Sequence, residues 1–335
     1  MPPAKPFKTY QQQLALLESR GLTIGSPEAA QQALANINYY RLSGYWYPFR
    51  QSDEDARADD FYPGTTFEAV VSLYEFDVHL RQATFAGLCQ VEVMMRARLG
   101  HALGAVDPLM HLLPERLGPV AREERSSAPS PAYRKWLRLY ERALQDSRED
   151  FVAHHQTRYG GTLPVWAAVE VLDWGALTWL FILSPLAVQA TVAGCFGLTG
   201  PQLSSWMKSL NVVRNACAHQ GRLFNKVHAI KPKMPRAGMC PRLDAVRMAA
   251  EGIRPAGSSE TVTGQHWFGD RTFGQLTLVQ HLLDQGGVGD LSLIPRAVNT
   301  YPSIQRIPLS HMGAPAEWRR LPLWKSEDRH GHGDR

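Results

Sequence analysis

Hydrophobic side chains recur every three or four residues along most of the chain, which is the spacing of amphipathic helices. The clearest stripe lies in residues 203–225 and runs into a polar, basic segment. Its apolar positions are Leu203, Trp206, Met207, Leu210, Val213 and Cys217. The same spacing predicts one or two long helices over residues 67–103, and further helices over residues 133–159, 164–177 and 273–283. The pattern therefore predicts an all-α protein.

Two shorter helices are predicted near the N-terminus, each with its own starting signal. Thr9 followed by Gln12 fits a capping box, in which each residue bonds the other's backbone. Ser26 precedes a proline in the first turn of the second helix. Acidic residues 51–60 are predicted to form a surface loop, and the proline-containing residues 104–131 an irregular insertion.

The aromatic segment at residues 36–50 contains six aromatic residues and two arginines, and it has two interpretations. Tyr39 and Tyr40 can stack on RNA bases while Arg41 and Arg50 contact phosphates. Alternatively, the aromatic side chains pack the N-terminal helices against the body. The sequence favours packing, because burial dominates the energetics of aromatic side chains. In that case the two arginines can still point outward.

Changes in composition divide the chain into four parts. Residues 1–60 hold the N-terminal helices and the aromatic segment, and residues 61–228 form the helical core. Residues 229–325 carry more Pro and Gly with weak periodicity, and we expect an irregular C-terminal extension that packs on the core. Its expected anchors are Trp318 and Trp324. Residues 326–335 are expected to be a disordered tail.

Composition narrows the class of protein. The 335 residues are 44% hydrophobic and 20% charged, as is usual for a soluble globular protein. No apolar run reaches the ~18 residues that span a bilayer, and the N-terminus has no apolar signal core. We therefore expect a cytoplasmic protein with no membrane partner. The net charge of +5 favours an anionic partner such as nucleic acid.

Metal ligands and cofactor motifs are not apparent. The four cysteines form no C-x-x-C pair, so we expect reduced thiols rather than a zinc site. Glu149-Asp150 and His154-His155 are spaced so that a metal site is conceivable, but no third ligand accompanies them, which favours solvated surface. We predict no metal and no cofactor.

Candidate catalytic residues lie at the end of the apolar stripe in residues 203–225. Arg214 and His219 form an R-x4-H pair, and Asn215 shares a helix face with His219 because the two are four residues apart. A second R-x4-H pair, Arg96 and His101, also lies in helical sequence. A third, Arg306 to His311, contains a proline and is not expected to be helical.

Other side chains extend these pairs. Glu92 is four residues before Arg96 and can orient its guanidinium. Basic residues after the first pair are candidate phosphate contacts, although a solvated loop is equally consistent with them. These residues are Arg222, Lys226, Lys231 and Lys233.

Several stretches together resemble the AbiD/AbiF-type abortive-infection proteins of bacteria, part of the HEPN superfamily of helical ribonucleases. The matching stretches are KPFKTYQQQLALLESRGL, NINYYRLSGYWYPFR, PGTTFEAVVSLYEFDVHLR, PVWAAVEVLDWGAL, SWMKSLNVVRNACAH with GRLFN, and GAPAEWRRLPLW. The resemblance implies an HEPN-like helical bundle with two R-x4-H motifs, and antiphage defence by RNA cleavage. It also implies a small structured RNA that restrains the protein. Two positions depart from the family pattern: Ala97 replaces a polar residue, and Gln220 replaces a second histidine.

If the resemblance holds, Arg214, Asn215 and His219 would be catalytic, together with Arg96 and His101. The 2′-OH of RNA is its own nucleophile, so cutting needs a base, an acid and positive charge on the phosphate. Imidazoles supply the first two and guanidiniums the third, which predicts metal-independent cutting to a 2′,3′-cyclic phosphate and a 5′-OH. We expect the two pairs to converge in one basic pocket, within one chain or a homodimer. The alternative is a module that binds structured RNA without cutting it.

Overall fold

A computed structural model describes residues 4–52, 57–124, 128–251 and 269–325. Within them it contains thirteen α-helices, short 3-10 helices and one two-stranded antiparallel sheet. The helical prediction is therefore confirmed. No helix in these ranges combines the length and apolar character needed to cross a membrane.

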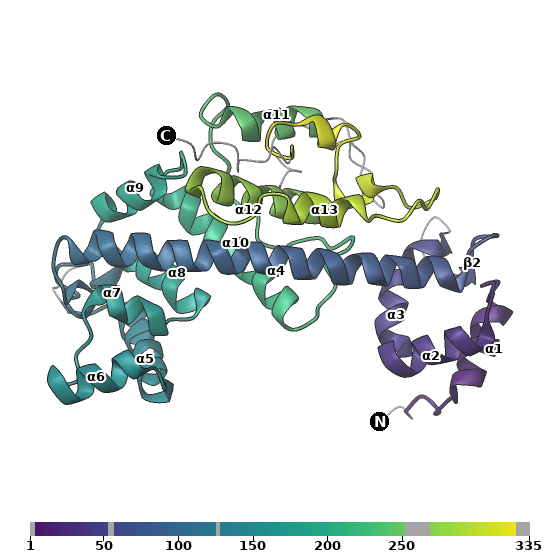
Figure 1. Cartoon of the computed structure of the whole chain (residues 1–335), viewed down its shortest axis with the longest axis horizontal. Helices are drawn as coiled ribbons and strands as arrows, with labels where there is room; N and C mark the ends of the chain where they lie inside the picture. Colours follow the sequence, from purple (N-terminus) through teal and green to yellow (C-terminus); the bar gives the residue numbers. More distant parts are fainter. Residues whose placement is uncertain (1–3, 53–56, 125–127, 252–268, 326–335) are drawn as a thin grey trace, which may run out of the picture.

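Helix α4 (Phe67–Gly104) is the element on which the others pack. Its 38 residues extend about 57 Å along the longest axis of the molecule (Figure 1). The Thr66 side chain caps its first turn by accepting from the amide of Ala69 at 3.1 Å. Five helices contact it, so buried residues occur on every side of α4: α3 (Tyr39–Trp46), α7 (Val165–Ala168), α10 (Gly200–Ala218), α12 (Thr272–Gly286) and α13 (Leu293–Asn299).

The N-terminal elements gather at the start of α4 (Figure 1). They are α1 (Tyr10–Ser19), α2 (Pro27–Ile37), α3 (Tyr39–Trp46), β1 (Arg50–Ser52) and β2 (Arg57–Phe61). The capping box at Thr9 and the Ser26 cap form as predicted. The loop prediction for residues 51–60 is wrong in part, because β1 and β2 pair there. That hairpin lacks alternating apolar residues, so its sequence gives no strand signal.

A second group of helices surrounds the C-terminal end of α4 (Figure 1). They are α5 (Pro131–Asp146), α6 (Asp150–Arg158), α7 (Val165–Ala168), α8 (Trp174–Leu183) and α9 (Leu186–Gly194). Close approach here depends on Gly100, where a Cβ would lie 3.0 Å from the Cα of Trp166. The single helix predicted over 133–159 is two helices, since the chain is extended at Ser147 and Glu149.

The C-terminal elements lie on one side of α4, except α10, which crosses it (Figure 1). They are α10 (Gly200–Ala218), α11 (Pro241–Ala250), α12 (Thr272–Gly286) and α13 (Leu293–Asn299). The extension is more ordered than the irregular segment predicted, because α12 and α13 both pack on α4. Trp318 and Trp324 anchor its end as predicted, and Trp324 stacks on Phe273 with ring centroids 4.4 Å apart. The tail at residues 326–335 lies outside the described residues.

His111 makes the fold sensitive to acid. Its ring is fully buried against Trp136 and Tyr140, and neither ring nitrogen has a hydrogen-bond partner. Burial lowers the pKa of His111 from 6.5 to about 4. Between those pH values the unfolded chain binds a proton that the folded chain does not, so stability falls as pH falls through this window.

His111→Leu should reduce this acid sensitivity. We expect the free energy of unfolding to drop by about 2 kcal/mol less between pH 7 and pH 5 in the variant than in the parent. Urea unfolding at the two pH values measures the difference. The exposed His154→Leu is the control and should behave as the parent does. Equal acid sensitivity in all three proteins would contradict the assignment.

Candidate functional site

Helix α10 carries the first R-x4-H pair at its C-terminal end. Its predicted apolar stripe is buried, and the indole N–H groups of Trp206 and Trp174 fix its position by donating to the carbonyls of Lys233 and Met207, each at 2.8 Å. The helix ends at Ala218 with His219 as its C-cap, and Gln220 turns the chain away with a φ of 56°. Asn215 and His219 are both exposed, one turn apart.

The loop that follows α10, residues 219–226, is held by a buried carboxylate on α4. Asp77 is fully buried and accepts from the amides of Leu223 at 3.2 Å and Phe224 at 2.6 Å. It also accepts from the guanidinium of Arg81 and, at 2.6 Å, from the hydroxyl of Tyr45. Burial and the Asp77 charge raise the pKa of Tyr45, which keeps its hydroxyl a donor. One carboxylate thus joins α3, α4 and the loop.

Helix α3 also forms hydrogen bonds with the loop of residues 219–226. Arg41 donates to the carbonyl of Gln220 at 2.5 Å, and Arg222 donates to the carbonyl of Gly44. These two predicted RNA contacts therefore have a structural role in fixing the loop. Their guanidiniums still add positive charge next to His219 and Lys226.

The two motif arginines meet on one carboxylate. Glu92 lies 2.6 Å from Arg96, as its spacing predicted, and 3.8 Å from the Nε of Arg214. The Arg96 guanidinium also donates to the carbonyl of Leu172 at 2.8 Å. Arg214 lies over the ring of Phe85, 5.7 Å from its centroid. Glu92 is nearly buried, so it neutralises part of the charge of both arginines.

Within one chain the backbones of the two histidines are separated along α4, so convergence of both R-x4-H pairs in one pocket remains a prediction for a homodimer. Asp77 accepts a hydrogen bond from the amide of Leu223, which is four residues beyond His219. On α4, Asp77 lies 24 positions before His101. That is about 36 Å of helix, and four residues of extended chain cover at most about 14 Å. The two histidine backbones are therefore roughly 15 Å or more apart.

His101 lies instead in a separate hollow at the C-terminal end of α4. The hollow, of about 420 Å³, is lined by Arg96, Ala97 and His101 together with the exposed Trp166 of α7. Ala97 occupies the position that Asn215 has in the first pair, so this surface offers no amide beside its histidine. The two R-x4-H pairs are thus not equivalent.

The aromatic segment mainly packs the N-terminal helices, as the sequence favoured. Leu42, Tyr45, Trp46 and Phe49 are buried. The RNA-platform alternative concerned other side chains of the segment. Three of them, Tyr39, Tyr40 and Arg50, line a pocket next to α1.

The remaining candidates lie on the surface. Lys231 and Lys233 are exposed on the segment that runs along α10, and Lys226 is partly exposed. Burial raises the pKa of Cys217 to about 12, which keeps that thiol protonated. In the described part of the chain, no three or more His, Cys, Asp or Glu side chains are placed to hold a metal ion.

The sequence reasoning missed Asp77 and the link from Glu92 to Arg214. Asp77 and Arg81 do have the i,i+4 spacing of an ion pair, and they occur among apolar positions of α4. That signal predicts a buried pair. It does not predict the loop amides, which are more than 140 residues away in the chain.

These features define a helical protein with Arg214, Asn215 and His219 at the end of α10, next to a loop that a buried ion pair fixes. The family model for Abi-like proteins matches residues 32–225, which is more than half of the chain. The chain therefore belongs to the Abi-like family of abortive-infection proteins. The match begins in α2 and ends in the loop after α10, so it includes Asp77, Glu92 and both R-x4-H pairs. No curated protein and no solved structure matches the chain.

Asp77→Ala should destabilise the protein severely, because it leaves the Arg81 guanidinium buried without its carboxylate. We expect a loss of about 3–5 kcal/mol in the free energy of unfolding, measured with urea. Glu75→Ala, at an exposed position on the same helix, is the matched control and should change little. In Asp77→Leu/Arg81→Met, stability should largely return, but the amide protons of Leu223 and Phe224 should exchange faster. An Asp77→Ala protein as stable as the parent would contradict this role.

Proposed function

We propose that this protein is a metal-independent RNA endonuclease acting in abortive infection, with Arg214, Asn215 and His219 at its catalytic centre. The observation that carries the proposal is the exposed cluster at the end of α10, where an amide and an imidazole share one face beside basic side chains. Family membership and the resemblance to helical ribonucleases support it.

The chemistry requires few groups. An imidazole removes the proton of the 2′-OH, whose oxygen attacks the neighbouring phosphorus, and the P–O5′ bond breaks. A second proton donor protonates the leaving 5′-oxygen. The products are a 2′,3′-cyclic phosphate and a 5′-OH. Arg214 stabilises the phosphorane charge, and Asn215 positions the imidazole or the phosphate.

In this proposal the second imidazole comes from another chain, because the backbones of His101 and His219 lie roughly 15 Å or more apart within one chain. A two-fold dimer that pairs the ends of α10 brings His219 next to its own copy, with only one kind of interface. This pairing is favoured over one with His101 since the Ala97 surface lacks the amide that accompanies His219. The homodimer is thus part of the proposal.

Glu92 has a defined part in this proposal. It holds Arg96 and is 3.8 Å from Arg214, so an arriving phosphate competes with a carboxylate for Arg214. Arg96 also donates to the carbonyl of Leu172 and acts on the site through Glu92. In this view Arg96 is a positioning residue rather than a group that touches RNA.

An RNA-binding module that does not cut is the second candidate. The observation that favours it is the separation of the two histidines within one chain. It requires the basic surface around His219 to hold structured RNA, including a small RNA that restrains the protein. Binding of that kind is steeply salt-dependent, whereas cutting is read directly from the products.

Cleavage of single-stranded RNA by the purified protein in EDTA is the decisive measurement. We expect His219→Ala and Arg214→Ala to reduce the rate at least 100-fold, since each removes a group used in the transition state. His101→Ala should retain most activity. Loss of activity in His101→Ala at unchanged stability would instead place His101 in the site. Salt-sensitive binding with no cutting by any protein would favour the binding module.

In cells, expression of the parent should arrest growth and reduce phage yield, and His219→Ala should do neither. The matched control is His154→Ala, an exposed histidine on α6, which should act as the parent does. Equal protein levels are checked by immunoblot. Phage protection that persists in His219→Ala would contradict defence by RNA cleavage.

A further inference from the structure

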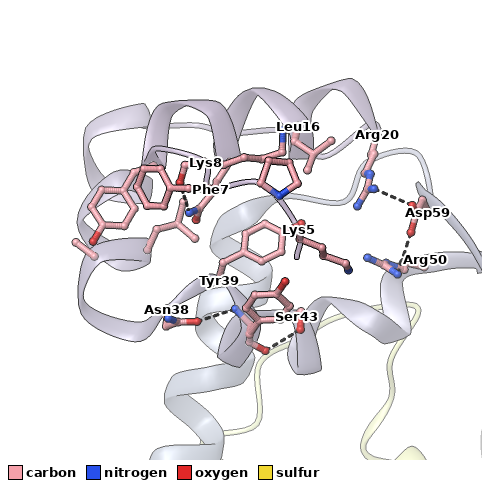
Figure 2. A pocket seen from close by; sticks show the side chains of 16 residues that line it. Lys5, Phe7, Lys8, Leu16, Arg20, Asn38, Tyr39, Ser43, Arg50 and Asp59 are labelled. Atoms are coloured by element: carbon pink, nitrogen blue, oxygen red, sulfur yellow. Dashed lines mark hydrogen bonds and ion pairs between the residues drawn. The ribbon is translucent and has the colours of Figure 1, made fainter. Parts of the chain in front are cut away.

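A second candidate site lies next to the start of α3. It is a pocket of about 770 Å³ between the N-terminal segment, α1, the end of α2 and the start of α3 (Figure 2). Ligand sites for small molecules typically measure ~300–1,000 Å³, so its size is that of a binding pocket. The catalytic centre proposed above uses none of its lining residues.

Aromatic rings line one part of this pocket. Phe7 is 88% exposed, Tyr40 is 67% exposed and Tyr10 is 46% exposed, so their faces are available to a ligand. Tyr39 is more rigidly held, because its ring packs edge-on against Trp46 at a centroid distance of 4.8 Å. Three accessible rings around one pocket are unusual, since exposed aromatic side chains lose the burial that normally stabilises them.

Positively charged side chains line another part of the pocket. Arg20 and Arg50 both pair with Asp59, at 2.7 and 3.2 Å, and the Lys5 side chain extends towards Arg50 (Figure 2). Counting Lys8, the described lining residues carry four cations and one carboxylate, a net charge of +3. The pocket therefore attracts an anion.

Tyr39 lies between the aromatic part and the cationic part of the pocket. Figure 2 shows it between Phe7 and the Arg20–Asp59–Arg50 group. Burial raises the pKa of Tyr39, and the charges of Arg20 and Arg50 oppose that effect. Its hydroxyl remains protonated at neutral pH and can donate a hydrogen bond to an anionic oxygen.

We propose that this pocket binds a nucleotide, with the base stacked on Phe7 and Tyr40 and the phosphate held by Lys5, Arg20 and Arg50. A nucleotide combines a planar ring with an anion, and the pocket offers partners for both. An acidic peptide would not use the rings, and an apolar ligand would not use the cations. The nucleotide can be free or part of an RNA strand, since the pocket is open at the surface. The proposal does not depend on RNA cleavage.

Binding is measured with the His219→Ala protein, so that RNA is not consumed. The probes are AMP, followed by calorimetry, and a labelled single-stranded 12-mer RNA, followed by anisotropy over a salt series. We expect Phe7→Ala/Tyr40→Ala to weaken binding about tenfold, because each base stack contributes strongly. Lys5→Glu should weaken binding and reduce the salt slope by about 0.7 or more.

Matched controls are available elsewhere on the surface. Tyr159→Ala removes a tyrosine that is 65% exposed, close to the 67% of Tyr40, and Lys135→Glu reverses an exposed lysine on α5. Both controls should bind as the parent does. All the altered side chains are exposed, so thermal unfolding should be unchanged throughout.

Each outcome decides the proposal. If Phe7→Ala/Tyr40→Ala binds both AMP and the RNA more weakly, the pocket takes free nucleotides. If only RNA binding weakens, the pocket takes a nucleotide within a strand. Both results support the proposal. Unchanged binding by Phe7→Ala/Tyr40→Ala overturns it, even if Lys5→Glu binds more weakly, because that result describes a basic patch without base recognition. Cleavage by the protein with intact His219 is scored separately. Failure of the pocket would leave cutting intact, and failure of cutting would leave nucleotide binding intact.

Discussion

The buried ion pair between Asp77 and Arg81 is the interaction on which the candidate site depends. A carboxylate and a guanidinium inside a protein are costly to desolvate, and here the cost is offset by Tyr45 and by two loop amides on the same carboxylate. Apolar residues of similar size in place of this pair would pack equally well, and such a replacement is often neutral or stabilising for a protein. What they cannot do is hold the backbone of residues 223 and 224. The ion pair thus gives the loop after α10 one conformation.

Local patterns predicted the helices and several contacts well. Burial of the α10 stripe, the caps at Thr9 and Ser26, and the Glu92–Arg96 pair all follow from spacings of three or four residues. The same logic failed where sequence spacing carries no signal. The β1–β2 hairpin has no alternation, and no local pattern marks the break between α5 and α6. Only residues 32–225 match the family model, yet α12, which contacts both α4 and α10, lies beyond them.

The candidate site shows more clearly what could not be predicted from the sequence. Sequence reasoning chose the arginines and histidines but could not place the two pairs relative to each other. Their positions depend on the direction in which α10 crosses α4, which is set by packing between residues more than 100 positions apart. That crossing brings Arg214 to Glu92 and carries His219 towards Asp77, away from His101. A pattern with two similar motifs therefore yields two different surfaces.

Helix α3 has only eight residues, yet its two sides serve different neighbours. Tyr39, Tyr40 and Ser43 face the aromatic and cationic pocket, while Arg41 and the carbonyl of Gly44 hold the loop that carries His219. Hardly any residue of this helix can change without consequences on one side or the other. During evolution, the preference of the pocket and the shape of the loop would have to drift together, and the helix would tolerate less variation than its surface position suggests.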